Sequence, residues 1–335
     1  MCCGVGSAEK RRCWRVIICQ SCALVAARRS SASSSVLARH HLPKLRAGGI
    51  RGGCFVLWVD PPFTDDPAAR MAQLLSAVAA EMAECNEAAL VTSVTEIESV
   101  AATERFPILL GVEGLSAIGE NVDAIDRLHA FGARHAMLTW NEANALATGA
   151  KADPSRGLTE LGRRALARLE DLHMLVDVSH LNDRSFWDVL AAVHGPIVAS
   201  HSNARALAEH PRDLTDDQLR AIAETGGLVG LNANKNFVSP DPAQQTVDQF
   251  VRHAVHIAEL VGVRHLAFGF DFNEYLADDA TTSYNDGGNP NVPGLEDAHH
   301  TPVYVEALRR AGFSERELAQ ISWQNWLRVI GEVVG

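Results

Sequence analysis

The sequence predicts an α/β protein of the (β/α)8 TIM-barrel type, because short apolar runs alternate with amphipathic segments along most of the chain. Continuous apolar strands that alternate with helices indicate a parallel sheet covered by helices. Eight such repeats favour a closed barrel over an open, doubly wound sheet, and no G-x-G-x-x-G motif follows an early strand to support a dinucleotide site. The eight runs are residues 16–22, 53–59, 108–113, 135–140, 174–179, 196–200, 228–232 and 266–270.

The segments between these runs carry apolar residues about every 3.6 positions, which is the period of an α-helix. Thr215 stands before Asp216 and Asp217, and a threonine followed by acidic residues is typical of a helix start. We expect a single barrel domain over residues 1–335, with closing helices in 303–335 and with residues 1–15 as a candidate for disorder. The clearest helical segments are residues 68–82, 158–172, 183–193, 216–225 and 246–261.

The composition is that of an ordinary globular protein, with 47% hydrophobic and 21% charged residues among 335. The net charge of −11 provides no basic face for nucleic acid. No stretch approaches the roughly 20 consecutive apolar residues that a membrane-spanning helix needs. We therefore expect neither a nucleic-acid partner nor a membrane span.

The amino terminus admits two interpretations. Basic residues within positions 10–15 precede an apolar run at 16–27 that ends in small residues, which is the layout of a signal peptide. The run also suits the first buried strand of the barrel, which is the interpretation we favour. Most cysteines lie within the first 22 residues and only Cys54 and Cys85 follow, so no disulfide framework extends through the body. This distribution favours a cytoplasmic protein, while secretion or membrane association stays open.

Ligand-capable or polar side chains stand at the ends of many predicted strands. In a (β/α)8 barrel the carboxyl ends of all strands meet at one mouth, where active sites are built. We therefore expect residues that are distant in sequence to surround one cavity. The residues are Glu113 at the end of the third run, Trp140 at the end of the fourth with Asn141 next to it, His180 after the fifth, His201 after the sixth and Asp271 after the eighth.

Glu113, His180 and His201 together predict a zinc site. Neutral imidazoles and a carboxylate are ligands that zinc prefers, and rigid strand ends can hold them around an open coordination position. Zinc would lower the pKa of bound water toward about 7 and so generate a hydroxide nucleophile. Each residue alone is more often structural, and only the combination at successive strand ends indicates a metal-dependent hydrolase.

Two further charged residues are candidates for the chemistry. Asp271 is a candidate proton carrier, and the competing interpretation is a helix or loop cap. Arg212 can grip a substrate carboxylate through two parallel hydrogen bonds, although an arginine in such a position is by default a solvated surface residue.

Several motifs resemble the membrane (renal-type) dipeptidase family of zinc peptidases. The resemblance covers about Leu42 to the end of the chain. Its central motifs are Asp177-Val178-Ser179-His180, the stretch 196–207 that contains His201, and His210-Pro211-Arg212, joined by residues 42–49, 111–114, 226–230, 325–329 and the segment around Asp271.

The resemblance implies a barrel with two bridged zinc ions. Glu113 would bridge the metals, His180 and His201 would complete one of them, and Asp271 would carry the proton to the leaving amine. Arg212 would bind the free carboxylate of a dipeptide, whose carboxyl-terminal residue is often a D-residue in this family. Trp140 stands where some members carry a substrate-facing histidine, which we interpret as a difference in specificity. Family members often form homodimers.

The chain departs from the family on strand one, which members end with a His-x-Asp pair that binds the second metal. Gln20 and Cys22 occupy those positions here. Glutamine is a poor zinc ligand, and a thiolate is softer and bulkier than the expected carboxylate. We expect the second metal to bind weakly or not at all, and an altered reading frame or start site within residues 1–41 is an alternative origin of the difference.

Three functional hypotheses follow. The first is a zinc-dependent dipeptidase, impaired by loss of the strand-one pair. The second is a pseudoenzyme that binds a small ligand in the barrel mouth without competent metal chemistry. The third is a one-metal amidohydrolase that acts on lactones or cyclic amides.

Overall fold

The computed structural model describes residues 17–19, 35–274 and 288–335. In these ranges a nine-stranded sheet follows the hydrogen-bonded order β1-β2-β4-β5-β6-β7-β8-β9, and β3 pairs with β4 beside this path. All of these pairings are parallel. The strands are β1 (Ile17–Cys19), β2 (Gly53–Trp58), β3 (Ala88–Val91), β4 (Phe106–Glu113), β5 (Ala133–Met137), β6 (Leu175–Asp177), β7 (Ile197–Ala199), β8 (Leu228–Leu231) and β9 (Leu266–Phe268).

The sheet confirms the predicted fold class. Each apolar run predicted from the sequence overlaps one strand of the main path, and the sheet curls as in an α/β barrel. Within the described ranges the end strands β1 and β9 are not paired with each other. The prediction missed β3, which is only four residues long, is half alanine, and pairs as a strand only with the first half of β4.

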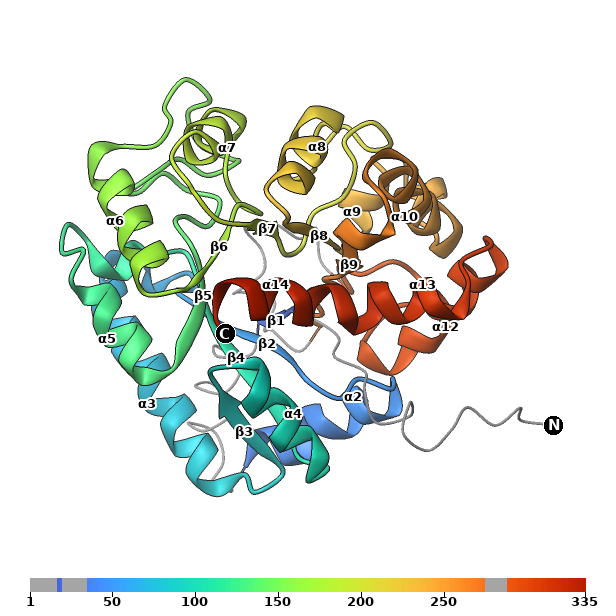
Figure 1. Ribbon diagram of the computed structural model, residues 1–335, viewed down its shortest axis with the longest axis horizontal. Helices are drawn as coiled ribbons and strands as arrows, with labels where there is room; N and C mark the ends of the chain where they lie inside the picture. The colour runs from blue at the N-terminus through green and yellow to red at the C-terminus, as the bar shows by residue number, and fades with distance from the viewer. Residues whose placement is uncertain (1–16, 20–34, 275–287) are drawn as a thin grey trace.

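Most helices lie around the outside of the strands, as the alternating pattern predicted, and α14 crosses the centre of the view (Figure 1). The capping box that Thr215 forms with Gln218 confirms the predicted start of α8. The helices are α2 (Leu42–Ala47), α3 (Pro67–Glu84), α4 (Val94–Ala102), α5 (Ala124–Phe131), α6 (Glu160–Asp171), α7 (Asp183–Leu190), α8 (Asp216–Glu224), α9 (Lys235–Val238), α10 (Val247–Val261), α12 (Thr301–Arg310), α13 (Glu315–Ala319) and α14 (Asn325–Val333). Short 3-10 or π turns cover Leu37–His41, Phe63–Asp65, Ser116–Ile118, Pro242–Gln244, Val263–His265, Ala298–His300 and Gln320–Gln324. No helix in the described part of the chain is both long and apolar enough to cross a bilayer.

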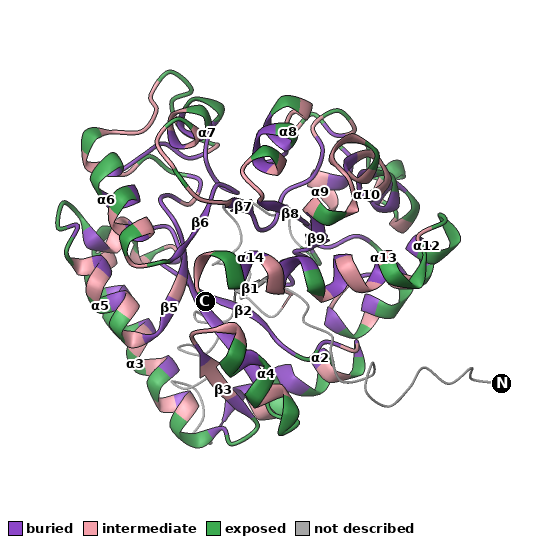
Figure 2. Cartoon of the chain, viewed as in Figure 1, coloured by how far each residue is buried: buried purple, intermediate pink, exposed green. Residues whose placement is uncertain are grey.

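The strands form the buried centre of the molecule, and the helices turn one face inward (Figure 2). Every residue of β2 and β4 is buried, because helices cover one side of the sheet and the curled interior covers the other. Gly111 in β4 is required by this interior, since a Cβ at that position would collide with the imidazole of His135 on β5.

The strand interpretation of the amino terminus agrees with the pairing of β1 and β2, which runs from Ile17 opposite Cys54 to Cys19 opposite Val56. Gln20 and Cys22, the positions of the altered metal pair, lie outside the described residues.

Candidate metal centre

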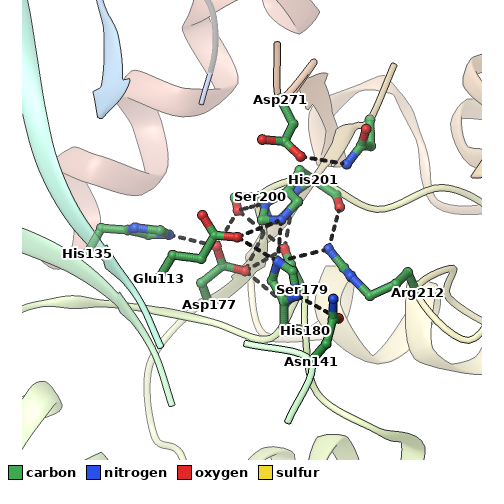
Figure 3. Close-up of polar contacts among 11 residues, drawn as sticks. Glu113, His135, Asn141, Asp177, Ser179, His180, Ser200, His201, Arg212 and Asp271 are labelled. Atoms are coloured by element: carbon green, nitrogen blue, oxygen red, sulfur yellow. Dashed lines mark hydrogen bonds and ion pairs between the residues drawn. The ribbon is translucent and has the colours of Figure 1, made fainter. Parts of the chain in front are cut away.

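Three strand ends bring Glu113, His180 and His201 together. Glu113 is the last residue of β4, His180 follows β6 by three residues, and His201 follows β7 by two. One ligand atom from each residue lies within 4.8 Å of the others, and all three residues are buried. His180 Nε2 is 2.8 Å from Glu113 Oε1 and 2.8 Å from His201 Nε2, while His201 Nε2 is 3.9 Å from Glu113 Oε1 (Figure 3).

The outer nitrogens of the two imidazoles are held by fixed partners. His180 Nδ1 lies 3.0 Å from Asn141 Oδ1, and an amide oxygen can only accept a hydrogen bond, so Nδ1 carries the proton. His201 Nδ1 lies 2.8 Å from Ser200 Oγ. The Ser200 hydroxyl gives its only hydrogen to the Asp177 carboxylate, so His201 Nδ1 must donate as well. Both Nε2 atoms are therefore unprotonated and directed at each other.

This donor set fits a divalent cation. Burial lowers the pKa of His201 to about 3 and that of His180 well below its ordinary value, and the nearby charge of Arg212 adds to both effects, so both imidazoles are neutral. Two unprotonated nitrogens in contact repel each other, and a cation shared with Glu113 would remove that repulsion. Neutral imidazoles with a hydrogen-bonded outer nitrogen and a carboxylate are a zinc-type ligand set.

Asp271 lies at the same end of the sheet, after β9, in a left-handed backbone conformation with φ of 57°. Asn232 Nδ2 donates to Asp271 Oδ2 over 3.3 Å. Burial raises the pKa of Asp271 to about 7, against the opposing charge of Arg212. Burial and the charge of Asp271 also raise the pKa of Glu113 well above its ordinary value. A cation beside these carboxylates would act in the opposite direction.

Arg212 is buried, with an exposed fraction of 2%. This placement excludes the default expectation of a solvated surface residue. Its Nη2 lies 3.3 Å from His180 Nε2 and 3.4 Å from the carbonyl oxygen of His201. Nε and Nη1 have no hydrogen-bond partner in the described ranges. Buried polar groups nearly always have a hydrogen-bond partner. Two guanidinium nitrogens without one, beside a pocket, therefore indicate a binding site for an anionic ligand.

A pocket opens at this end of the sheet. Trp140 packs against Trp58 with ring centroids 5.0 Å apart, and its centroid lies 6.0 Å from that of His180. The pocket therefore has an aromatic wall next to the metal ligands. Its lining residues are Trp58, Glu113, Trp140, Asn141, Lys151, His180, His210, Arg212, Asn234, Asn236, Phe237, Asp271 and Asn273.

The site residues predicted from the sequence within the described ranges thus converge. His201 is not one of the residues that line the pocket, whereas Asn141 both lines it and contacts His180. Seven further pocket residues were not predicted from the sequence, namely Trp58, Lys151, His210, Asn234, Asn236, Phe237 and Asn273. Trp58 is the last residue of β2, Asn236 and Phe237 lie in α9, and the others lie outside the helices and strands, so no common pattern in the sequence marks them.

Asp177 was not predicted to have a role, although it stands in the motif that ends in His180. Asp177 pairs with His135, whose Nε2 lies 2.7 Å from Asp177 Oδ2. Burial opposes the charge on His135, but Cys54 and the hydrogen bond to Asp177 outweigh it and raise the pKa of His135 to about 10. Burial likewise opposes the charge on Asp177, yet the hydrogen bond and charge of His135 hold the pKa of Asp177 below its ordinary value.

A curled parallel sheet that carries a carboxylate and two imidazoles at its carboxyl ends defines a metal-dependent hydrolase of the α/β-barrel class. Within that class, the sequence model of the membrane dipeptidase family (peptidase family M19) matches residues 23–334. The chain belongs to this family and is a hydrolase of the metallo-dipeptidase type.

Two curated relatives are similar to much of this chain. The "uncharacterized protein in pqqA 5'region" of Klebsiella pneumoniae is 34% identical over 254 residues, which are 73% of this chain and 88% of that protein. An uncharacterized dipeptidase of Schizosaccharomyces pombe is 34% identical over 224 residues, which are 66% of this chain and 52% of the yeast protein. This chain therefore spans about half the length of that relative.

Two solved structures share the fold. The metallo peptidase described as dipeptidase AC superposes with a TM-score of 0.83 at 25% identity, over 96% of this chain and 98% of its own. A metallo peptidase from Rhodobacter sphaeroides, crystallised with a phosphinate mimic of the dipeptide L-Ala-D-Ala, gives a TM-score of 0.81 at 24% identity, over 96% and 100%.

Proposed function

We propose that this protein hydrolyses the peptide bond of dipeptides with zinc held by Glu113, His180 and His201. The observation that carries the proposal is the contact between two unprotonated imidazole nitrogens and a carboxylate, next to a pocket that contains a buried, unsatisfied Arg212. When bound, zinc supplies Lewis-acid polarisation and makes water acidic enough to attack at neutral pH.

The residues around the ligands have separate tasks in this proposal. Arg212 directs Nε and Nη1 at the carboxylate of the dipeptide and so fixes the scissile bond relative to the metal ligands. Asp271, which lines the same pocket as Glu113 and His180, takes the proton from the attacking water and passes it to the leaving amine nitrogen. Trp140 and Trp58 exclude water and restrict the substrate side chain, and Asn141 keeps the proton on His180 Nδ1.

The direct test measures zinc content together with hydrolysis of Gly-Leu and Ala-D-Ala. We expect one tightly bound zinc per chain and measurable turnover. His201→Ala is expected to lose both, whereas the matched variant His256→Ala, on the outer helix α10, is expected to keep both. Stoichiometric zinc in folded His201→Ala would contradict the ligand assignment.

The number of metals is a separate part of the proposal. Because Gln20 and Cys22 replace the family's His-x-Asp pair, we propose that only the first metal binds tightly. The double variant Gln20→His with Cys22→Asp is expected to gain a second zinc and a large increase in kcat/KM. A restored pair without such a gain would mean that these positions do not face the metal centre.

The loss of the His-x-Asp pair is also consistent with two rival functions. A pseudoenzyme would bind small carboxylates in the pocket and hydrolyse nothing, even with zinc at the site. A one-metal amidohydrolase would bind zinc and cleave lactones or cyclic amides in place of dipeptides. A substrate panel that includes these compounds decides among the three.

We also propose a cytoplasmic location and a homodimer. Cys54 and Cys85, in the described range 35–274, are both free, which suits a reducing compartment. Mass spectrometry of the mature amino terminus tests the location, and sedimentation equilibrium tests the dimer.

A further inference from the structure

One buried carboxylate holds both turns that carry the imidazole ligands. Asp177 Oδ1 accepts hydrogen bonds from the backbone N–H of Ser179 over 2.9 Å and from that of Ser200 over 3.1 Å. Ser179 immediately precedes His180, and Ser200 immediately precedes His201. The spacing of the two imidazoles is therefore tied to a single side chain.

The two turns are also tied to each other through their serines. The backbone N–H of His201 donates to Ser179 Oγ over 3.1 Å, and Ser179 Oγ in turn lies 2.7 Å from Asp177 Oδ1. Ser200 Oγ donates to Asp177 Oδ2 and accepts from His201 Nδ1. This last pair of bonds fixes which nitrogen of His201 is protonated and leaves Nε2 free to ligate.

The other side of Asp177 is held from β5. His135 is 1% exposed, and its Nε2 donates to Asp177 Oδ2 over 2.7 Å while its Nδ1 lies 3.8 Å from Cys54 Sγ. The glycine at position 111 leaves room for this ring. Figure 3 shows the resulting row from His135 through Asp177 and Ser200 to His201, on the side of the ligands away from Arg212.

We propose that His135, Asp177 and Ser200 are positioning residues of the metal centre, which set the spacing of His180 and His201 and the tautomer of His201. The inference rests on the proposed metal site. None of the three lines the pocket, so they act through the ligands and do not touch substrate. His135 and Ser200 donate hydrogen bonds to the carboxylate that holds both ligand turns, and partners of this kind behind metal ligands orient the ligands.

Ser200→Ala tests the tautomer directly. The variant removes one buried hydroxyl but keeps the backbone bond to Asp177, so the turn is expected to remain. Without its acceptor, Nδ1 no longer holds the proton in preference to Nε2, and a protonated Nε2 cannot bind zinc. We expect zinc affinity, measured by competition with a chromophoric chelator, to fall about 10- to 100-fold.

Tyr304→Phe is the matched control. It also removes one buried hydroxyl, which donates to the Phe250 carbonyl oxygen over 3.2 Å. Both residues are distant in sequence from the metal ligands. Its zinc affinity is expected to equal that of the unmodified protein. Zinc affinity is compared in the same way for a second pair of variants, His135→Gln and His253→Gln. Both histidines are buried, but only His135 contacts Asp177.

The tautomer of His201 is read independently of zinc from long-range proton–nitrogen NMR spectra of the metal-free, histidine-labelled protein. We expect an Nδ1–H form in the unmodified protein and a shift toward Nε2–H in Ser200→Ala. Unchanged tautomer and unchanged zinc affinity in Ser200→Ala would overturn the inference. If the unmodified protein binds no zinc, the proposed function fails, and the NMR comparison still decides whether Ser200 sets the tautomer.

Discussion

Two buried arginines at different places in the molecule show how a structural charge differs from a functional one. Arg70 on α3 is 4% exposed and binds Asp60 through Nε at 2.7 Å and Nη2 at 2.9 Å. Its Nη1 donates to Gln73 over 3.2 Å, and its guanidinium lies 4.1 Å from the Phe63 ring centroid. Every nitrogen of this guanidinium is satisfied within the fold.

Arg212 is buried to a similar degree but has no carboxylate partner. Two of its three nitrogens have no hydrogen bond within the described part of the chain, and the third makes long contacts of 3.3 and 3.4 Å. Folding alone gives no reason to bury such a group. A buried charged group whose hydrogen bonds are incomplete therefore indicates a ligand site, whereas one whose hydrogen bonds are all made within the fold indicates only a role in stability.

The largest expected effect is the loss of stability in Arg70→Met. Arg70→Met leaves the buried Asp60 carboxylate without its cation, and breaking a buried pair in this way costs about 3–5 kcal/mol. We expect a matching loss in the free energy of unfolding, measured by urea denaturation, with kcat/KM unchanged for the folded fraction. A smaller loss in the free energy of unfolding than that of Arg212→Met would contradict this distinction between the two arginines.

Arg212→Met is expected to lower kcat/KM and to leave the stability of the fold nearly unchanged. Loss of a desolvated charge partner of the substrate carboxylate costs about 2–4 kcal/mol, equivalent to a decrease in kcat/KM of about 30- to 1000-fold. The free energy of unfolding is expected to change little, because the methionine leaves no hydrogen-bonded carboxylate behind. Unaltered kcat/KM on dipeptides would show that Arg212 does not bind the substrate.

The third buried cation, His135, differs from both arginines because it can lose its proton. Its pKa is raised from 6.5 to about 10, so the folded state retains a proton that the unfolded chain loses above pH 6.5. The stabilisation is complete below that pH and disappears as the pH rises toward 10. The lowered pKa of Asp177 adds a stabilisation that is present above its ordinary 3.8 and is lost on acidification.

Thermal unfolding across pH checks this expectation. The difference in Tm between the unmodified protein and His135→Gln is expected to be greatest between about pH 4 and 6.5 and to shrink toward pH 10. Arg70→Met should show no such decline, since an arginine stays protonated over that range. A pH-independent difference for His135→Gln would mean that the His135–Asp177 pair is not ionised.

The smallest expected effect concerns the aromatic rings beside the two guanidiniums. Phe237 lies 5.5 Å from Arg212, and Phe63 lies closer to Arg70. A cation–π contact contributes about 0.5–1 kcal/mol. Phe237→Leu is expected to raise KM for dipeptides by about 2- to 5-fold at unchanged Tm, whereas Phe63→Leu is expected to lower Tm and leave KM unchanged.

The sequence allowed much of the fold and the metal ligands to be predicted. The apolar strands are separated by helical periods, so β2 and β4 to β9 were found with errors of a few residues at their ends. Glu113, His180 and His201 were found because the ends of parallel strands must meet at one edge. β3 was missed because a short strand with two alanines carries little periodic signal.

The contacts around the ligands could not be predicted in the same way. Burial of Arg212 depends on the loop after β7 folding back over the strand ends, and no local pattern specifies that. Asp177 was visible next to Ser179 and His180, but its bond to His135 joins residues 42 positions apart. Such contacts are set by packing between strands rather than by the residues of either strand.

The measurement that tests the metal centre most directly is zinc X-ray absorption on the protein loaded with one equivalent of zinc. We predict a shell of only nitrogen and oxygen ligands, with the outer-shell scattering of two imidazoles, which His180 and His201 supply. A sulfur ligand at about 2.3 Å would place the tightly bound zinc on a cysteine and contradict the site.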